Sequence, residues 1–169
     1  ALARHSGGLL VIPLVETAAG LRAVHEIAGA ETVLRLAFGS VDYSLDIGAE
    51  EVREALSLAR QTLVHASRCA GLEGPIDGVT AQVRDAERAR DDSAYAKRLG
   101  FTGKLCIHPA QVAPVREAFA PSEEQLTWAR EVLASSTDAG ARSVGGAMVD
   151  APVLERARRI SQHEGGAAR

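Results

Sequence analysis

Four short apolar runs, each followed by a segment with helical periodicity, constrain the fold of this chain more than any other feature. The runs lie at Leu9–Val15, Val33–Phe38, Pro75–Asp77 and Lys104–Ile107. Uninterrupted apolar runs of this kind are typical of strands that are buried on both faces of a parallel sheet. Because strand and helix alternate four times, the sequence predicts an α/β fold with a parallel sheet.

The helical segments are predicted from apolar residues that recur on one face. The first contains Leu21, Val24 and Ile27, and the second contains Val52, Leu56 and Leu63 and ends at Gly71. A Ser122-x-x-Gln125 capping box opens a later helix that runs through Leu133. The other predicted helices span Asp85–Leu99, Gln111–Phe119 and Ala151–Ile160, and the Gly- and Ser-rich stretch Ser135–Ala147 is predicted to be a flexible loop or lid.

Four βα units are half of an eight-unit barrel. A closed (β/α)8 barrel needs about 250 residues, and an open four-stranded sheet leaves two unpaired edges. The chain also lacks an initiator Met, and Ala1–His5 has the character of a helix end before Gly7-Gly8. We therefore expect the last four βα units of a TIM (β/α)8 barrel, with Leu9–Val15 as its fifth strand. Residues 1–134 would form the half-barrel, and residues 135–169 a loop and a C-terminal helical segment.

Composition excludes several classes of protein. The 169 residues are 46% hydrophobic and 24% charged, which is typical of a globular domain. A net charge of −3 and 4% aromatic residues do not favour a nucleic-acid partner, and no apolar run approaches the roughly 20 residues of a membrane span. Cys69 and Cys106 have neither CxxC spacing nor a neighbouring His pair. They are predicted to be small, reduced core residues of a cytoplasmic protein, with no zinc site and no disulfide framework.

Polar residues follow the predicted strands at their carboxyl ends. Glu16 ends the first run, Asp42 closely follows the second, and His108-Pro109 follow the fourth. The carboxyl ends of parallel strands meet at one edge, and neighbouring strands lie about 4.8 Å apart, so Glu16 and Asp42 could share one cation. Two carboxylates with open positions suit Mg²⁺. The backbone N–H groups of the Gly39-Ser40-Val41 turn would face an anionic substrate.

Each of these residues also has a purely structural interpretation. Glu16 could stabilise the start of the next helix by about 0.3–1 kcal/mol. Asp42 could be a turn residue. Asp46, four positions on, would point the same way in a helical turn, but only Asp42 is close to the strand end. Asp150 precedes Ala151-Pro152 and suits a helix N-cap worth about 1 kcal/mol. His108 could be held by packing before Pro109. The Asp77-Gly78 pair is interpreted as a turn, and the stretch "RDAERARDD" as a solvated helix face.

Four motifs in order carry a resemblance to a known family. "PLVETAAGL", "LAFGSVDYSLDIG", "GFTGKLCIHPAQ" and "GAMVDAPVLERARRI" together resemble the C-terminal half of the citrate lyase beta-subunit-like family, within the HpcH/HpaI aldolase and citrate lyase superfamily. The resemblance covers essentially the whole chain. It implies a (β/α)8 barrel and a Mg²⁺-dependent lyase. The implied reaction is retro-Claisen or aldol cleavage of an acyl-CoA ester such as citramalyl-CoA, malyl-CoA or a citryl thioester.

The resemblance also implies roles for individual residues. Glu16 of the "ET" motif and Asp42 of the "FGxxD" motif would hold the metal. Asp150 of the "MxDAP" motif would be the catalytic acid/base, delivered by a neighbouring subunit, so the protein would be a homo-oligomer, a trimer or its multiple. The residues Ile107, His108 and Pro109 would line the coenzyme A entrance.

The chain departs from the family pattern in one large respect. Nothing in it matches the family's first four strands, which carry the Arg that grips the substrate carboxyl and the basic residues that meet the CoA phosphates. Two other interpretations therefore stay open. One is an aldolase of the same superfamily that acts on free 2-keto-4-hydroxy acids, and the other is an inactive half-barrel with a structural or interaction role.

Overall fold

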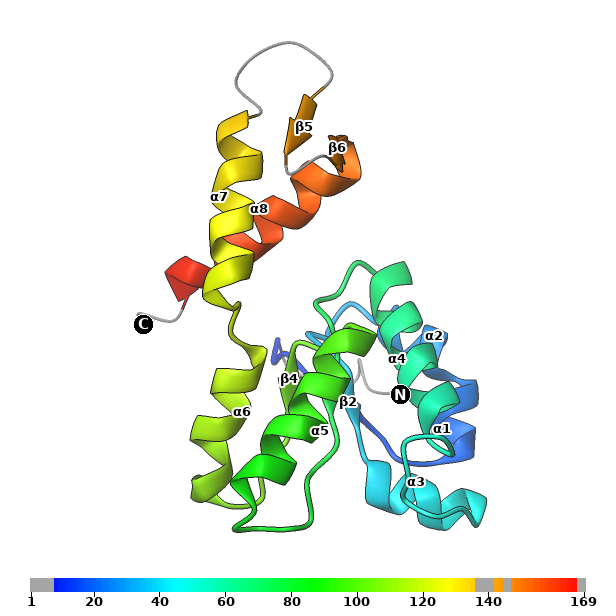
Figure 1. Ribbon diagram of the computed structural model, residues 1–169. Coiled ribbons are helices and arrows are strands. Elements are labelled where there is room, and N and C mark those ends of the chain that lie inside the picture. Colours follow the sequence, from blue (N-terminus) through cyan, green and yellow to red (C-terminus); the bar gives the residue numbers. More distant parts are fainter. Residues whose placement is uncertain (1–7, 136–141, 145–146, 167–169) are drawn as a thin grey trace. The chain divides into compact units, whose positions relative to one another are not determined.

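The computed structural model describes residues 8–135, 142–144 and 147–166 (Figure 1). The chain divides into two compact units, residues 1–119 and residues 120–169. The sequence-based division at residue 134 stays a prediction. The predicted helix end at Ala1–His5 lies outside the described residues. Among the described helices, none has both the length and the apolar character that a membrane span requires.

A four-stranded parallel sheet forms the centre of the first unit. Its strands lie in chain order: β1 (Leu14–Val15), β2 (Ala37–Phe38), β3 (Ile76–Asp77) and β4 (Gly103–Lys104). In the register, Val15 lies opposite Phe38, and Ile76 lies opposite both Ala37 and Gly103. The predicted α/β class with a parallel sheet is confirmed. The strands are shorter than the apolar runs, and β4 begins one residue before the predicted run.

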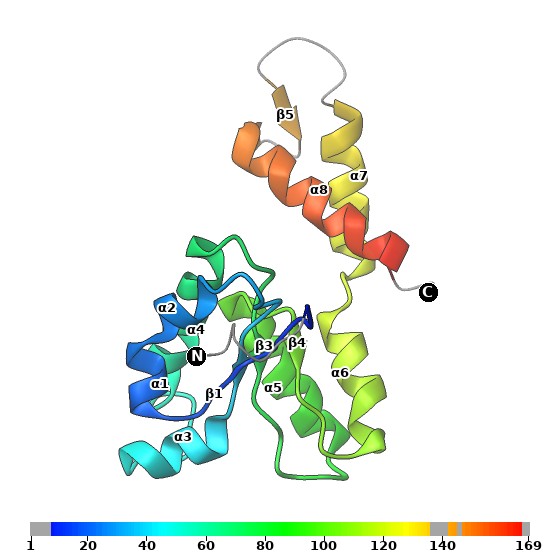
Figure 2. The same ribbon diagram turned by 180° about the vertical axis from the view of Figure 1, so that it is seen from behind.

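Helices connect the strands, and Figures 1 and 2 show α4 beside α2 and α5 beside α6. The first predicted helix is divided at Ala23 into two short helices. The second begins at Ser57 rather than Val52, and a helix after β2 precedes it. The helices of this unit are α1 (Ala18–Arg22), α2 (Val24–Ala28), α3 (Ser40–Ile47), α4 (Ser57–Cys69), α5 (Ala86–Leu99), the 3₁₀ helix η2 (Pro109–Gln111) and α6 (Val112–Phe119).

Local capping explains where several helices begin and end. The Thr17 hydroxyl accepts a hydrogen bond from the Gly20 N–H at the start of α1, 3.0 Å away. Asp85 accepts one from the Arg88 N–H at the start of α5. Gly100 ends α5 in the left-handed conformation, with φ of 103°, which glycine adopts without a steric penalty. Each cap satisfies backbone groups that have no partner inside the helix.

The core lies between the sheet and its helices. Val24, Leu36, Phe38 and Leu63 are fully buried there, together with Phe101 just before β4. In contrast, apolar side chains along the β1 edge are exposed. These are Leu9, Leu10, Ile12 and Leu14, with Leu34 just before β2.

Both cysteines differ from their prediction. Cys69 and Cys106 are free, but both are exposed, so the interpretation as core residues is wrong. Cys69 is the last residue of α4 and lies outside that helix's buried face, which contains Ala59, Leu63 and Ala66. The exposure of Cys69 could not be predicted from apolar periodicity, because the sequence does not show where the buried face of a helix ends.

The second unit consists of two helices and a hairpin. Its elements are α7 (Glu123–Ser135), β5 (Arg142–Val144), β6 (Ala147–Val149) and α8 (Ala151–Gly166). The predicted capping box is confirmed: the Ser122 N–H donates to Gln125 Oε1 over 3.0 Å, and the Gln125 N–H donates to Ser122 Oγ over 3.1 Å. α7 packs on α8 through Ala129, Val132 and Ala157.

The stretch predicted to be a flexible loop is only partly described. β5 pairs with β6 in an antiparallel arrangement, so residues 142–144 and Ala147 form strands rather than loop. Residues 136–141 and 145–146 of the predicted loop lie outside the described residues.

Candidate functional site

Glu16 and Gly39 meet at the carboxyl ends of β1 and β2. The Gly39 N–H donates to the Val15 carbonyl oxygen over 2.9 Å, which fixes Gly39 beside the half-buried Glu16. A Cβ on Gly39 would lie 2.5 Å from Glu16 Cβ and 3.1 Å from Glu16 Oε2. Real Cβ atoms essentially never approach to less than 3.0 Å. The missing side chain of Gly39 therefore makes the room in which the Glu16 carboxylate lies.

α3 carries two carboxylates, Asp42 and Asp46, that could share a cation with Glu16, and they differ in their contacts. Asp46 Oδ2 accepts a hydrogen bond from the Ala18 N–H over 2.7 Å and so fastens the start of α1. Asp42 lies in the first turn of α3, three residues after Gly39. Within the part of the chain that the structure describes, no hydrogen bond or ion pair engages the carboxylates of Glu16 and Asp42.

This difference favours Asp42 over Asp46 as a partner of Glu16. A carboxylate that already accepts a backbone hydrogen bond serves the fold, whereas an unengaged one keeps its oxygens available. Mg²⁺ takes one or two protein carboxylates and completes its shell with water and substrate oxygens. The donor set of Glu16 and Asp42 therefore fits such an ion chemically.

The turn after β2 is arranged differently from the prediction. The Gly39 N–H is already bonded to Val15, so Gly39 cannot offer it to an anion. The N–H groups of Ser40 and Val41 lie in the first turn of α3, where no acceptor exists within the helix. The Ser40 hydroxyl is buried and donates to Glu51 Oε1 over 2.8 Å. The N–H groups of this turn that the helix's own hydrogen bonds leave without an acceptor are therefore those of Ser40 and Val41.

The loop after β4 is held by a glutamine that the sequence did not single out. His108 Nδ1 accepts a hydrogen bond from the Ala110 N–H over 3.1 Å, and Pro109 opens η2. Gln111 is 2% exposed; its Oε1 accepts from the Ile107 N–H and its Nε2 donates to the Thr80 carbonyl oxygen. Gln111 thus joins the loop after β4 to the loop after β3. Because its Nδ1 accepts, a neutral His108 carries its proton on Nε2.

A buried charge network lies where the sequence predicted only a turn. Asp77 at the end of β3 is 1% exposed, and its two carboxylate oxygens meet Arg60 Nε at 2.9 Å and Lys104 Nζ at 3.4 Å. Lys104 Nζ also donates to the Gly78 carbonyl oxygen over 2.6 Å. One signal was visible in the sequence. Arg60 lies at helical spacing from Leu56, the residue just before α4, and from Leu63 within it, both of which are buried in the core.

A small polar cavity adjoins this network. It has a volume of about 100 Å³ and is lined by residues that include Arg53, Arg60, Asp92 and Lys104. Burial alone would raise the pKa of Asp92, but hydrogen bonds from Arg53 and Thr80 and nearby positive charges together lower it. Asp92 thus keeps its negative charge and balances the cations. The stretch "RDAERARDD" does contain the predicted i,i+4 ion pair, Arg88 to Asp92 at 3.2 Å, yet its Asp92 faces this cavity.

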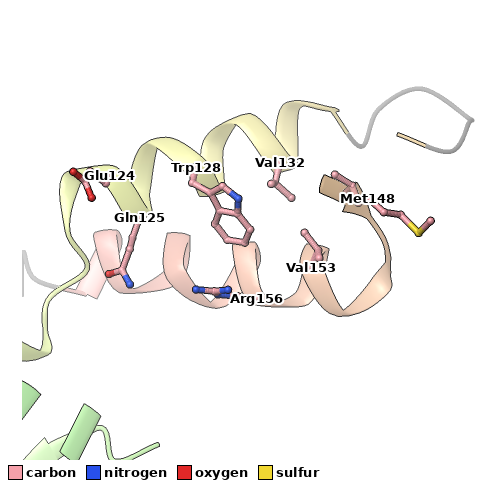
Figure 3. Close-up of a pocket in the computed structure, with 8 residues that line it drawn as sticks. Glu124, Gln125, Trp128, Val132, Met148, Val153 and Arg156 are labelled. Carbon is pink, nitrogen blue, oxygen red and sulfur yellow. The ribbon is translucent and has the colours of Figure 1, made fainter. Parts of the chain in front are cut away.

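Asp150 belongs to the second unit and caps α8. The Val153 N–H donates to Asp150 Oδ1 over 3.1 Å, as the structural interpretation expects. Asp150 is exposed, so this cap does not bury its carboxylate. The same unit contains a groove of about 400 Å³ that Asp150 does not line. Figure 3 shows Trp128 facing Arg156 in this groove, with 5.0 Å from the ring centre to the guanidinium carbon.

The comparisons with known proteins identify the family. The model of the HpcH/HpaI aldolase/citrate lyase family matches residues 3–109. The chain belongs to this family. The family resemblance predicted from the four motifs is thereby confirmed.

Relatives with names and structures are similar over most of the chain. A citrate lyase subunit beta-like protein of Deinococcus radiodurans is 37% identical over 92% of this chain and 57% of that protein. The human mitochondrial citramalyl-CoA lyase is 38% identical over 88% of this chain and 48% of that protein. The chain thus spans about half the length of the relatives it matches.

Solved structures agree with the fold. The crystal structure of CitE from Mycobacterium tuberculosis, in complex with magnesium, acetoacetate and coenzyme A, superposes with a TM-score of 0.81. The two chains are 35% identical, and the match covers 92% of this chain and 61% of the CitE chain. A citrate lyase from Burkholderia xenovorans also has a TM-score of 0.81, at 25% identity, over 99% of this chain and 56% of that one.

Proposed function

We propose that this chain is the C-terminal half of a Mg²⁺-dependent carbon–carbon lyase that acts on acyl-CoA esters. The observation that carries the proposal is a pair of carboxylates, Glu16 and Asp42, that make no hydrogen bond or ion pair among the described residues. They lie at the end of β1 and in the first turn of the helix after β2. Family membership supports it, since relatives are named citrate lyase and citramalyl-CoA lyase. A crystallised relative in complex with magnesium and coenzyme A supports the choice of cofactor and substrate class.

The half-barrel architecture is part of the proposal. β1 and β4 are the edges of the described sheet, and a parallel sheet of this family would close only when four more strands pair with them. The exposed apolar side chains along β1 support this, because a partner strand and its neighbours would cover them. We propose that the remaining four βα units come from the rest of the protein. A cytoplasmic location stays a prediction.

The residues would divide the chemistry as follows. Glu16 and Asp42 would hold the ion, and the room above Gly39 lets the Glu16 carboxylate stay at the strand end. When bound, Mg²⁺ supplies Lewis-acid chemistry that lowers the pKa of the substrate hydroxyl and neutralises its neighbouring carboxylate. The N–H groups of Ser40 and Val41 orient the negative end of the substrate. Ile107, His108 and Pro109, braced through Gln111, line the entrance for coenzyme A.

Bond cleavage requires a proton acceptor and a proton donor. The hydroxyl loses its proton, its oxygen becomes a carbonyl as the C–C bond breaks, and the leaving carbon of the acetyl thioester accepts a proton. Asp150 is our candidate for this proton transfer, since its carboxylate is exposed even while it caps α8. We propose that a neighbouring subunit delivers it, in a trimer or a multiple of one.

A substrate screen tests the reaction class. The full-length protein with Mg²⁺ is expected to cleave citramalyl-CoA or malyl-CoA and to leave aldol products of pyruvate and aldehydes unchanged. The reverse preference would establish the aldolase that acts on free 2-keto-4-hydroxy acids. Inactivity on both sets of substrates, together with a lack of Mg²⁺ binding, would favour the third interpretation, an inactive half-barrel with a structural or interaction role.

Subunit mixing tests delivery of Asp150. Glu16→Ala and Asp150→Ala proteins are each expected to be inactive, and hetero-oligomers of the two are expected to regain part of the activity through hybrid sites. Well-mixed hetero-oligomers without any recovered activity would contradict delivery from a neighbouring subunit.

A further inference from the structure

Two histidines and a cysteine gather on the outer side of the first unit. His65 and Cys69 lie one turn apart on α4, and His25 comes from α2, which packs beside α4 in both views (Figures 1 and 2). The nitrogen, nitrogen and sulfur atoms that these three residues offer all lie within 4.8 Å of one another. All three side chains are exposed.

The geometry within the group is close to that of a metal-binding triad. Cys69 Sγ lies 3.7 Å from His65 Nδ1 and 3.8 Å from Nε2, so either ring nitrogen can turn toward a shared ion. The rings of His25 and His65 meet edge to face, with centroids 5.5 Å apart. Tetrahedral Zn²⁺, with bonds of about 2.0–2.3 Å, needs ligand atoms roughly 3.3–3.6 Å apart. Small rotations of exposed side chains close the remaining gap.

The backbone fixes the approach of the two helices independently of these side chains. Val24 and Ala28 of α2 are buried in the same core cluster as Leu63 and Ala66 of α4. His25 therefore directly follows the buried Val24 on α2, and His65 lies between the buried Leu63 and Ala66 on α4. The triad is presented from a packed seam rather than from a loop, which lowers the ordering cost of binding.

The donor chemistry differs from that of the proposed Mg²⁺ site. Imidazole and thiolate ligands select Zn²⁺ and similar transition metals, whereas Mg²⁺ and Ca²⁺ require oxygen ligands. The location differs as well. The helix of a βα unit runs back toward the amino ends of the strands, so Cys69, at the end of α4, lies away from the strand ends that carry Glu16.

We propose that His25, His65 and Cys69 form a binding site for Zn²⁺, with water in the fourth position. Binding would release the thiol proton of Cys69 to solvent as the Zn–S bond forms. The spacing of the cysteines in the sequence did not predict this site, because one histidine lies 44 positions before Cys69 and reaches it only through helix packing.

Cobalt(II) titration of the chelator-treated full-length protein tests the proposal. With excess Mg²⁺ present to occupy oxygen-ligand sites, we expect a thiolate-to-cobalt charge-transfer band together with the strong visible bands of tetrahedral Co²⁺. Stoichiometric Zn²⁺ should abolish both, and further Mg²⁺ should not. Cys69→Ser is expected to remove the charge-transfer band, whereas the matched control Cys106→Ser should retain it.

The histidines are tested by affinity. Loss of an outer-shell partner weakens metal binding about 10–100-fold, so loss of a direct ligand in His25→Ala or His65→Ala should weaken Co²⁺ binding at least about tenfold. His108→Ala is the control and should leave the Co²⁺ affinity unchanged. Absence of the charge-transfer band in the unmodified protein, or its persistence in Cys69→Ser, would overturn the proposal. These outcomes do not depend on lyase activity.

Discussion

Removal of the Asp77 carboxylate is expected to destabilise the first unit strongly. The side chain of Asp77 is 1% exposed and faces two cations, of which Lys104 is 2% and Arg60 10% exposed. Asp77→Ala leaves both positive charges without their buried partner. Removing one partner of a buried ion pair costs about 3–5 kcal/mol in the free energy of unfolding.

Urea denaturation measures this loss. With a slope of about 2 kcal/mol per molar urea, the unfolding midpoint of Asp77→Ala should fall by about 1.5–2.5 M. Arg60→Met is expected to cost less, about 1.5–3 kcal/mol, because Lys104 still neutralises Asp77. Asp91 provides the matched control, since its ion pair with Arg53 is exposed. Asp91→Asn should change stability by about 0–1 kcal/mol.

One result would refute this reasoning. If Asp77→Ala shifts the urea midpoint no more than Asp91→Asn does, the buried network does not hold β3 and β4 to α4. Other contacts would then have to hold the residues that line the adjoining polar cavity in place.

Three further changes probe the site and its surroundings. Gly39→Ala places a Cβ 2.5 Å from Glu16 Cβ, so the Glu16 side chain must move. The Mg²⁺ affinity measured by calorimetry should therefore fall at least about tenfold. Gly29→Ala is the control: the nearest atom to its added Cβ lies at 3.4 Å, so the Mg²⁺ affinity should not change. Asp92 has a lowered pKa in the folded state, so its contribution to stability is present above its unfolded pKa of about 4 and is lost as pH falls through the folded value. Between about pH 6 and about pH 3, the urea midpoint should fall less in Asp92→Asn than in the unmodified protein. An equal fall in both proteins would contradict the lowered pKa of Asp92. Gln111→Ala frees the loop after β4 and should raise the KM for an acyl-CoA ester without weakening Mg²⁺ binding, and an unchanged KM would show that the loop needs no such brace.

The sequence was sufficient for features that depend on neighbouring residues. The four apolar runs predicted the parallel strands, and Ser122 and Gln125 predicted the start of α7. The strand-end position of Glu16 followed from the same rhythm. These features depend on short-range patterns, which periodicity and capping rules describe directly.

Features that depend on long-range packing were missed. Asp77 meets Arg60 and Lys104, which are 17 and 27 positions away, and no local pattern encodes such a meeting. The sequence favoured Asp42 over Asp46 only because Asp42 lies closer to the strand end. The contact that distinguishes them in the structure, a hydrogen bond from the Ala18 N–H to Asp46 Oδ2, joins residues 28 positions apart.

The hairpin of β5 and β6 was missed for a different reason. Its strands are three residues each. All of β5 and the first residue of β6 lie in a Gly- and Ser-rich stretch, whose composition is typical of a loop. The division of the first predicted helix at Ala23 was missed because apolar periodicity continues across it from Leu21 to Ala28.

Mg²⁺ binding to the full-length protein is the most direct test of the proposed site. Isothermal titration calorimetry should show that Glu16→Gln and Asp42→Asn each weaken Mg²⁺ at least about tenfold. Asp46→Asn, which alters the cap on Ala18 but no proposed ligand, should bind Mg²⁺ like the unmodified protein. Unchanged affinity in Glu16→Gln and Asp42→Asn, or an equal loss in Asp46→Asn, would contradict the assignment of Glu16 and Asp42 as the metal ligands.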